Sequence, residues 1–253
     1  MAIYPELKGR GVAITGAANG IGAVAARSFA AQGATVYLLD IDGAGVERIA
    51  AQLRGESRQA QAVQVDITDE ASVKNAFAAI AAGGGLDILI NCAGGYGRLA
   101  TIEDMDIGEW DRTVALNLRS VFLCSRAAIA LLKKSKAGRI INIASISGRT
   151  VHASSSPAYG SAKAGVIQFT RFLAHELGPH GITSNSISPL TTLTPRVAAL
   201  RTPEQVEKIA AQVPLRRLAR SEDHVATMLF LASDGAGFIN GAALDTNGGR
   251  VMM

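Results

Sequence analysis

The chain has few cysteines and no long apolar run, and these absences exclude several classes of protein. Only Cys92 and Cys124 occur among the 253 residues, so the sequence contains neither a disulfide framework nor the CxxC spacing of a zinc site. The first ten residues lack the apolar core of a signal peptide, and no stretch approaches the roughly 20 continuous apolar residues of a membrane span. We therefore expect a soluble cytoplasmic protein with no membrane partner.

Charged residues are also scarce, at 18% of the chain, and they nearly balance to a net charge of +4. Basic residues gather only around 133–136 and 216–220, and no aromatic residues are interleaved with them. We interpret both groups as solvated surface and expect no nucleic-acid partner. The four histidines show no metal-ligand spacing, so no metal site is predicted. The hydrophobic share of 48% excludes a disordered chain.

Short apolar runs alternate with amphipathic segments through the first part of the chain. The runs are continuously apolar, which is typical of strands covered on both faces. This alternation predicts an α/β protein with a doubly wound parallel sheet and helices on both faces. The expected strands are 11–15, 34–40, 62–66, 86–91 and 139–145, and the expected helices are 20–32, 43–53, 69–82 and 106–134.

The second half continues the pattern with less apolar elements. We expect a helix at 157–178, a strand at 183–188, a helix at 221–232 and a short strand near 242–245. The strand at 183–188 contains alternating serines, so its burial would require a partner for each hydroxyl. No linker or repeat interrupts the chain, and residues 1–253 are predicted to form one domain with a substrate loop at about 189–215.

A glycine-rich turn follows the first predicted strand and leads directly into a helix. Gly16, Gly20 and Gly22 lie in the segment TGAANGIG. Glycines there permit a tight turn and let backbone amides approach a pyrophosphate at the positive end of the helix. The spacing is Gly-x-x-x-Gly-x-Gly rather than Gly-x-Gly-x-x-Gly, so a purely structural turn stays an alternative.

Acidic residues end the second and third predicted strands. Asp40 is placed to accept hydrogen bonds from the ribose hydroxyls of an adenosine, and its charge would repel the 2′-phosphate of NADP. Neither Asn19 nor Ile41 supplies a compensating cation, so NAD is favoured over NADP. The alternative is that Asp40 merely caps the following segment. Asp66 is a candidate partner of the adenine amino group.

A tyrosine and a lysine lie four residues apart in the segment PAYGSAKAG, on one face of the predicted helix at 157–178. A phenol with its ordinary pKa near 10 is a poor base at neutral pH unless a cation stabilises the phenolate. Lys163 is placed to provide that cation for Tyr159, and Ser145 ends the preceding strand.

Together these motifs resemble the short-chain dehydrogenase/reductase family. The resemblance rests on TGAANGIG, Asp40, Asp66, NCAG at 91–94, Asn117 in LNLRS, Ser145, Tyr159-x-x-x-Lys163 and FINGAALDTNGG, in the family's order. It implies a Rossmann fold and an NAD-dependent oxidoreductase that interconverts a secondary alcohol and a ketone by hydride transfer. A polyol, sugar or hydroxy acid is the expected kind of substrate.

The resemblance also implies a role for individual residues. Tyr159 matches the acid/base, Lys163 the lysine that lowers the tyrosine pKa and binds the nicotinamide ribose, and Ser145 the serine that orients the substrate oxygen. Asn117 matches the asparagine that holds a water for a proton relay. The positions that match cofactor contacts are Gly16, Asn19, Gly20, Ile21, Gly22, Asp40, Ile41, Asp66, Ile67, Asn91, Ala93, Gly94, Tyr159, Lys163, Pro189, Thr192 and Thr194.

Three loops are expected to face the substrate, at 94–99, 147–156 and 191–213. Their candidate contacts are Ser147, His152, Tyr96 and Arg196, with Arg98 and Arg149 nearby. The chain departs from the family at Leu190, which stands where a glycine usually lets the backbone pass close to the nicotinamide.

The resemblance leaves other activities and an oligomeric state to consider. A 3-oxoacyl-[acyl-carrier-protein] reductase is an alternative enzyme, and a catalytically idle NAD-binding scaffold or regulator is an alternative of another class. Family members commonly form homotetramers through the two long helices, and we expect the same here. A monomeric mass by light scattering at micromolar concentration would contradict that expectation.

Overall fold

A single parallel sheet forms the centre of the protein. The computed structural model describes residues 2–151, 155–199 and 201–252. Within these ranges, seven strands pair in the order β3-β2-β1-β4-β5-β6-β7, and all six pairings are parallel. The strands are β1 (Gly11–Thr15), β2 (Thr35–Asp40), β3 (Ala60–Gln64), β4 (Ile88–Asn91), β5 (Arg139–Ile143), β6 (Thr183–Pro189) and β7 (Ala243–Thr246).

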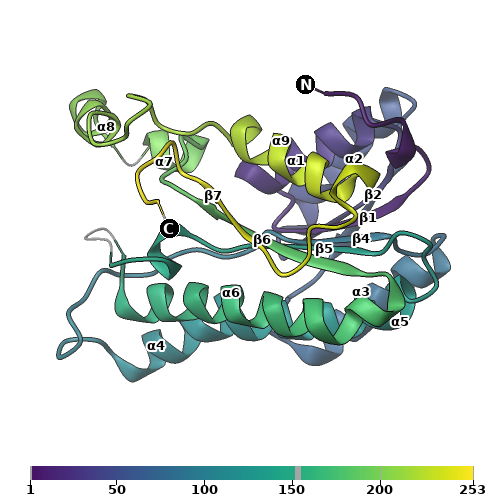
Figure 1. The fold of residues 1–253 in the computed structure, drawn as a ribbon, viewed down its shortest axis with the longest axis horizontal. Coiled ribbons are helices and arrows are strands. Elements are labelled where there is room, and N and C mark those ends of the chain that lie inside the picture. Colours follow the sequence, from purple (N-terminus) through teal and green to yellow (C-terminus); the bar gives the residue numbers. More distant parts are fainter. Residues whose placement is uncertain (1, 152–154, 200, 253) are drawn as a thin grey trace.

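Helices cover both faces of this sheet, as Figure 1 shows. One layer contains α1 (Gly20–Ala31), α2 (Gly43–Gly55) and α9 (Ser221–Ala232). The opposite layer contains α3 (Glu70–Ala82), α4 (Ile107–Val114), α5 (Ser120–Leu132) and α6 (Pro157–Leu177). The short helices α7 (Pro195–Ala199) and α8 (Pro203–Ala210) lie beyond the sheet edge, at the upper left of the view. The predicted doubly wound α/β fold is confirmed.

The alternation of side chains along the strands explains why both faces are buried. On β1, Val12 and Ile14 pack into the cluster under α1 and α9, whereas Ala13 between them joins the cluster under α3 and α5. On β2, Leu38 and Leu39 divide between the two clusters in the same way. Apolar residues on both sides of a strand are what a sheet between two helical layers requires.

The strand order places the functional part of the molecule. After β1 the chain builds β2 and β3 on one side, and it then returns to place β4 next to β1 on the other side. In open parallel sheets, ligands bind outside the carboxyl ends of the strands at this reversal. Consistent with that, a Cβ atom on Gly16 after β1 would lie only 2.8 Å from the Cα of Ala93 after β4.

Several elements differ from their predicted form. The third strand begins two residues earlier than expected, at Ala60. The predicted helix 106–134 is interrupted by a π-helical turn, η2 (Ala115–Arg119), and the loop-rich stretch at 189–215 contains α7 and α8. The stretch 107–132 is long and apolar enough to cross a membrane by composition alone, and here it packs along α3 and the sheet.

The polar strand β6 is fully buried, as its position between β5 and β7 demands. Asn185 donates its side-chain amide to the Ile239 carbonyl at 2.7 Å. Among the described residues, however, the hydroxyls of Thr183, Ser184 and Ser188 have no hydrogen-bond partner. The expectation that every buried hydroxyl on this strand is paired is therefore met only in part.

Candidate active site

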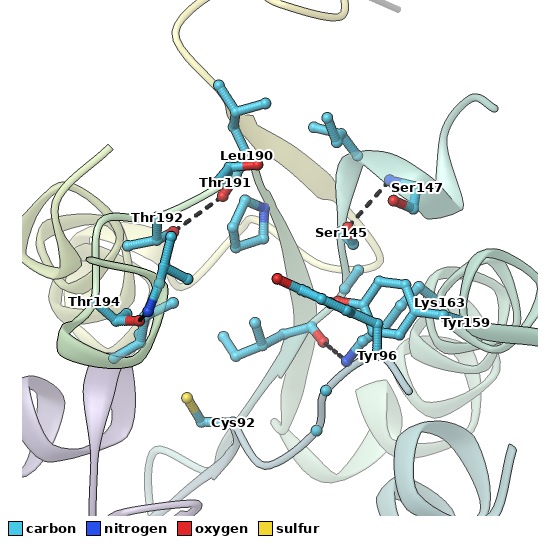
Figure 2. A pocket seen from close by; sticks show the side chains of 18 of the residues that line it. Cys92, Tyr96, Ser145, Ser147, Tyr159, Lys163, Leu190, Thr191, Thr192 and Thr194 are labelled. Atoms are coloured by element: carbon cyan, nitrogen blue, oxygen red, sulfur yellow. Dashed lines mark hydrogen bonds between the residues drawn. The ribbon is translucent and has the colours of Figure 1, made fainter. Parts of the chain in front are cut away.

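Two cavities lie side by side at the carboxyl ends of the strands. The Asp40 cavity has a volume of about 680 Å³, and the Tyr159 cavity has a volume of about 260 Å³. Ile21, Cys92, Gly94 and Thr194 line both cavities, so the two adjoin. Figure 2 shows the Tyr159 cavity, with Tyr96, Ser145 and Tyr159 on one side and Thr191, Thr192 and Thr194 on the other.

The floor of the Asp40 cavity is the glycine turn between β1 and α1. Gly16 has a φ of +71°, and a Cβ on Gly22 would lie 2.1 Å from the Gly16 carbonyl oxygen. Asn19 is the N-cap of α1 but makes no side-chain capping hydrogen bond, which leaves the first amides of the helix for a ligand. The predicted residues Gly16, Asn19, Gly20, Ile21 and Gly22 all line this cavity.

Asp40 has the position expected of it and also stabilises its own loop. Its carboxylate accepts hydrogen bonds from the amides of Ala18 at 3.0 Å and Asp42 at 3.1 Å. Asp66 accepts bonds from the amide and hydroxyl of Thr68, and these bonds lower the pKa of its carboxyl group. Both carboxylates line the Asp40 cavity, together with Ile41 and Ile67.

The segment after β4 passes between the two cavities. Thr15 Oγ1 accepts hydrogen bonds from the amides of Cys92 and Ala93, each at 3.0 Å, which anchors this segment to β1. Ala93 and Gly94 line the Asp40 cavity. The Asn91 side chain is buried beneath them, where its amide donates to Ser125 and Asn142, and Asn91 lines neither cavity.

Tyr159 and Lys163 lie on the first turns of α6. The helix begins at Pro157 after the N-cap Ser156, whose hydroxyl accepts from the Tyr159 amide at 3.3 Å. Burial raises the pKa of Tyr159 to about 12, while its contact with the Ser145 side chain acts in the opposite direction. Lys163 Nζ lies 5.7 Å from the Tyr159 ring centroid and donates to the Ile143 carbonyl at 2.7 Å. Burial lowers the pKa of Lys163 to about 8.

The loop after β5 brings Ser145 to the same cavity. Ser145 Oγ accepts a hydrogen bond from the Ser147 amide at 3.1 Å, which starts the short helix η3 (Ile146–Gly148). A Cβ on Gly148 would lie 2.6 Å from the Lys163 carbonyl carbon, so only glycine lets this loop pack directly on α6. Ser145 and Ser147 both line the Tyr159 cavity.

Asn117 lies at the centre of the π-helical turn between α4 and α5 and is fully buried. Its Oδ1 accepts from the Gly95 amide at 3.0 Å, and its Nδ2 donates to the carbonyls of Gly95 and Thr113. A Cβ on Gly94 would meet both Asn117 Oδ1, at 2.7 Å, and Lys163 Nζ, at 3.1 Å. The side chain therefore fixes the backbone at 94–95 directly beside Lys163.

A buried histidine holds the opposite wall of the Tyr159 cavity. His224 Nε2 lies 2.8 Å from Thr192 Oγ1, and His224 Nδ1 lies 3.0 Å from Thr246 Oγ1. Thr192 Oγ1 also donates to the Leu190 carbonyl at 3.0 Å, so its oxygen accepts a hydrogen bond from the Nε2–H group of His224. Burial lowers the pKa of His224 to about 4, which keeps the ring neutral. This role of His224 was not predicted from the sequence.

Leu190 is accommodated without filling the cavity. It is 5% exposed and packs with Ile146, Val213 and Val251. Leu190 lines the Tyr159 cavity together with Pro189, Thr192 and Thr194, and Figure 2 shows its side chain pointing away from Tyr159. Its isobutyl group thus joins the loop after β6 to the C-terminal segment.

The candidate substrate residues have different outcomes. Tyr96 and Ser147 line the Tyr159 cavity, and the Tyr96 ring lies edge-on to Tyr159 with centroids 5.9 Å apart. His152 lies outside the described residues, as does the Arg196 side chain. Arg149 was expected near the substrate, but this expectation is wrong, because its guanidinium donates to Asp245 at 3.1 Å and to the Ala243 carbonyl of β7.

The lining also contains residues that were not singled out from the sequence, among them Cys92, Val197 and Arg201. Burial raises the pKa of the Cys92 thiol to about 12, so it stays protonated at neutral pH and is no nucleophile. The predicted substrate loop contains Arg201, but nothing in its sequence distinguishes this arginine from the other basic residues there. Across the described ranges, no group of three His, Cys, Asp or Glu side chains could hold a metal ion.

Comparisons with known proteins agree with this geometry. A family profile described as enoyl-(acyl carrier protein) reductase matches residues 16–250. The chain is 37% identical to D-threitol dehydrogenase of Mycolicibacterium smegmatis, over 96% of this chain and 94% of that protein. It is 39% identical to cis-4-hydroxycyclohexanecarboxylate dehydrogenase of Sinomonas cyclohexanicum, over 93% and 94% respectively.

A solved structure shares the fold as well. The 3-oxoacyl-[acyl-carrier protein] reductase of Brucella melitensis with bound NAD superimposes with a TM-score of 0.91. Its sequence is 30% identical, and the match covers 99% of this chain and 94% of that one.

Proposed function

Because the chain belongs to the short-chain dehydrogenase/reductase family and is an oxidoreductase acting on CH–OH groups, we propose that it interconverts a small polar secondary alcohol and its ketone with NAD. A polyol, sugar or hydroxy acid is the proposed substrate. The observation that carries the proposal is the Tyr159 cavity, where Tyr159, Ser145 and Lys163 meet beside the cavity lined by Asp40. Relatives named for threitol, hydroxycyclohexanecarboxylate and xylose support this range of substrates.

The residues present fit a nicotinamide dinucleotide. Glycine at position 22 lets the turn pack directly on α1, because a Cβ there would lie 2.1 Å from the Gly16 carbonyl oxygen. The uncapped N-terminus of α1 offers amides to a pyrophosphate. Asp40 and Asp66 line the adenosine end, and Thr194 lines both cavities. A nicotinamide held by these residues would supply the hydride-transfer chemistry.

In the proposed reaction, the protein positions the substrate and moves its proton. Ser145 holds the substrate oxygen, and the Tyr159 hydroxyl removes the alcohol proton in oxidation or donates it to the carbonyl oxygen in reduction. Burial raises the pKa of Tyr159 and so disfavours the phenolate. The Ser145 contact and the nearby Lys163 ammonium are therefore needed to favour the phenolate. Asn117 fixes the backbone beside Lys163 and so maintains this arrangement.

A panel of secondary alcohols tests the proposal directly. The purified protein is incubated with NAD and with threitol, xylose, hydroxycyclohexanecarboxylate and 3-hydroxybutyrate, and NADH formation is followed by absorbance. Oxidation of at least one member supports the proposal. If NAD binds but no alcohol is oxidised and no ketone reduced across a broad panel, the idle scaffold is the better interpretation.

Cofactor choice is proposed to depend on Asp40, and Asp40→Asn should weaken the preference for NAD over NADP. The substitution keeps the shape of the side chain but removes the charge that repels a 2′-phosphate. We expect the ratio of kcat/KM values for NAD and NADP to fall about tenfold or more. Asp42→Asn is the matched control, because Asp42 caps α2 and does not line the cavity. An unchanged ratio in Asp40→Asn would place Asp40 away from the ribose.

Reduction of a 3-oxoacyl thioester is the second candidate function. The structural similarity to an acyl-carrier-protein reductase with bound NAD favours it. Assays with acetoacetyl thioesters of coenzyme A and acyl carrier protein decide between the two functions, since a strong preference for the carrier-protein thioester would replace the alcohol proposal.

The proposed homotetramer and the cytoplasmic location have supporting features. Phe122 on α5 and Phe172 on α6 are exposed on the outer face of the helix layer, where a second copy would cover them. Cys92 and Cys124 are both free thiols, as a reducing compartment favours. Recovery of the activity in the membrane fraction after cell breakage would contradict the cytoplasmic location.

A further inference from the structure

The charged groups that line the Tyr159 cavity are all cationic. Among the described lining residues these are Lys163 at its base and Arg201 at its rim, and no Asp or Glu lines the cavity. Lys163 is 3% exposed and engaged with Ile143, whereas Arg201 is half-buried. A cavity lined by charge of one sign favours a ligand group of the opposite sign.

A second cavity continues from this rim toward the solvent. This outer cavity has a volume of about 420 Å³ and shares Tyr96, Val197 and Arg201 with the Tyr159 cavity. Its remaining lining residues are Gln205, Lys208 and Ile209 of α8. The outer cavity also has no acidic lining residue among those described. The described residues that line the two cavities are therefore basic or neutral.

The face of α8 that lines the outer cavity carries no acidic lining residue. Lys208 and Ile209 follow Gln205 by three and four positions, so the three residues share one face of the helix, toward the outer cavity. Neither Glu204, which lies one turn before Lys208, nor Glu207 lines the cavity. Across the described ranges, neither Arg201 nor Lys208 forms a salt bridge.

Tyr96 connects this basic region with the reacting group. Its ring packs edge-on against Tyr159 and also lines the outer cavity. A substrate whose carbinol carbon lies at Tyr159 would therefore extend past Tyr96 to the arginine. Guanidinium groups bind carboxylates and phosphates through two parallel hydrogen bonds, which a neutral hydroxyl cannot match.

We propose that Arg201, with Lys208 behind it, binds an anionic carboxylate or phosphate group on the substrate. The inference rests on the proposed function and deepens it, because it selects hydroxy acids and phosphorylated alcohols over neutral polyols. Arg201 thus acts as a specificity-determining residue of the Tyr159 cavity.

The test compares pairs in which one member carries an anionic group and the other is neutral. The pairs are cis-4-hydroxycyclohexanecarboxylate with its carboxamide, 3-hydroxybutyrate with 3-hydroxybutyramide, and glycerol 3-phosphate with glycerol. For pairs that are turned over, kcat/KM should favour the anion, and Arg201→Gln should lower the ratio of kcat/KM for the anion to that for its neutral partner about tenfold or more. The carboxylate and phosphate pairs distinguish the two kinds of anion.

Arg58→Gln is the matched control variant. Arg58 is exposed and precedes β3, at the amino ends of the strands, so its removal changes the net charge equally without touching the cavity. If Arg201→Gln and Arg58→Gln lowered the preference for the anion equally, the preference would come from the net charge of the protein and not from Arg201. Neutral partners that are oxidised as well as the anions would also overturn the inference.

A binding measurement separates this inference from the proposed reaction. Calorimetry with the NAD-loaded Tyr159→Phe variant measures affinity for the same pairs without turnover. The anions should bind more tightly than their neutral partners, and this difference should disappear in the Tyr159→Phe, Arg201→Gln double variant. That result supports the anion site even if no member of the panel is oxidised. Equal or absent binding of all pairs contradicts the anion site, whereas turnover of neutral alcohols alone would leave the proposed reaction intact.

Discussion

Replacing Tyr159 by phenylalanine is expected to lower kcat by about 10²- to 10⁴-fold while NAD affinity stays nearly unchanged. The change removes only the hydroxyl that transfers the proton. The ring keeps its packing against Tyr96, with centroids 5.9 Å apart, and its position 5.7 Å from Lys163 Nζ. Steady-state kinetics on any substrate from the panel and titration of NADH fluorescence measure the two effects separately.

Tyr96→Phe provides the matched control for this prediction. Tyr96 lines the same cavity and loses the same atom, but its side chain is 43% exposed and lies outside the Ser145 and Lys163 arrangement. Its kcat should change by only about threefold or less, since it transfers no proton. Near-normal turnover in Tyr159→Phe, or a larger loss in Tyr96→Phe, would show that the acid/base has been assigned to the wrong residue.

Replacing Lys163 by methionine is expected to lower kcat/KM by about 10²-fold or more and yet to stabilise the fold. Burial lowers the pKa of this lysine from 10.5 to about 8, so the folded protein destabilises its own ammonium group. A shift of this size corresponds to about 3 kcal/mol at neutral pH. The lost hydrogen bond to the Ile143 carbonyl offsets part of this gain, which leaves a net increase of about 1–2 kcal/mol in the free energy of unfolding.

The pH dependence of stability identifies the cause. Below pH 8 both the folded and the unfolded wild-type protein keep the Lys163 proton, and the folded state carries the full penalty. Between pH 8 and 10.5 only the unfolded state keeps it, so wild-type stability should rise relative to the methionine variant. Urea unfolding at pH 7 and pH 10 measures this difference. A variant that is less stable than the wild type at both pH values would mean that the ammonium is well compensated.

The sequence predicted those features that depend on local chemistry. The strands at 11–15 and 34–40 are continuously apolar because both sheet faces are buried, and the glycine turn between β1 and α1 is visible because only glycine fits there. Tyr159 and Lys163 were predicted as a pair because their four-residue spacing places them on one face of a helix. All of these are relations between residues close together in the chain.

Contacts between distant segments could not be predicted in the same way. His224 is 32 residues from Thr192, and its ring links the loop after β6 to the end of β7 only in the folded protein. Arg149 looked like a substrate contact because of its loop, but Asp245, 96 residues later, turns it toward β7. Arg201 can be recognised as a candidate anion-binding residue only in the folded protein, where Tyr96 and α8 line the same cavity.

The π-helical turn at Ala115–Arg119 separates two helices that the sequence pattern reads as one. An α-helix advances by about 100° per residue, so a wider turn changes the rotational phase of everything after it. On α5, Leu123, Cys124, Ala128 and Leu132 then pack in the core cluster with strand residues, while the amide of Asn117 is directed at Gly95. The π-helical turn therefore sets the rotation of α5 relative to α4. This rotation lets the same stretch of helix pack against the core and direct Asn117 toward the active site.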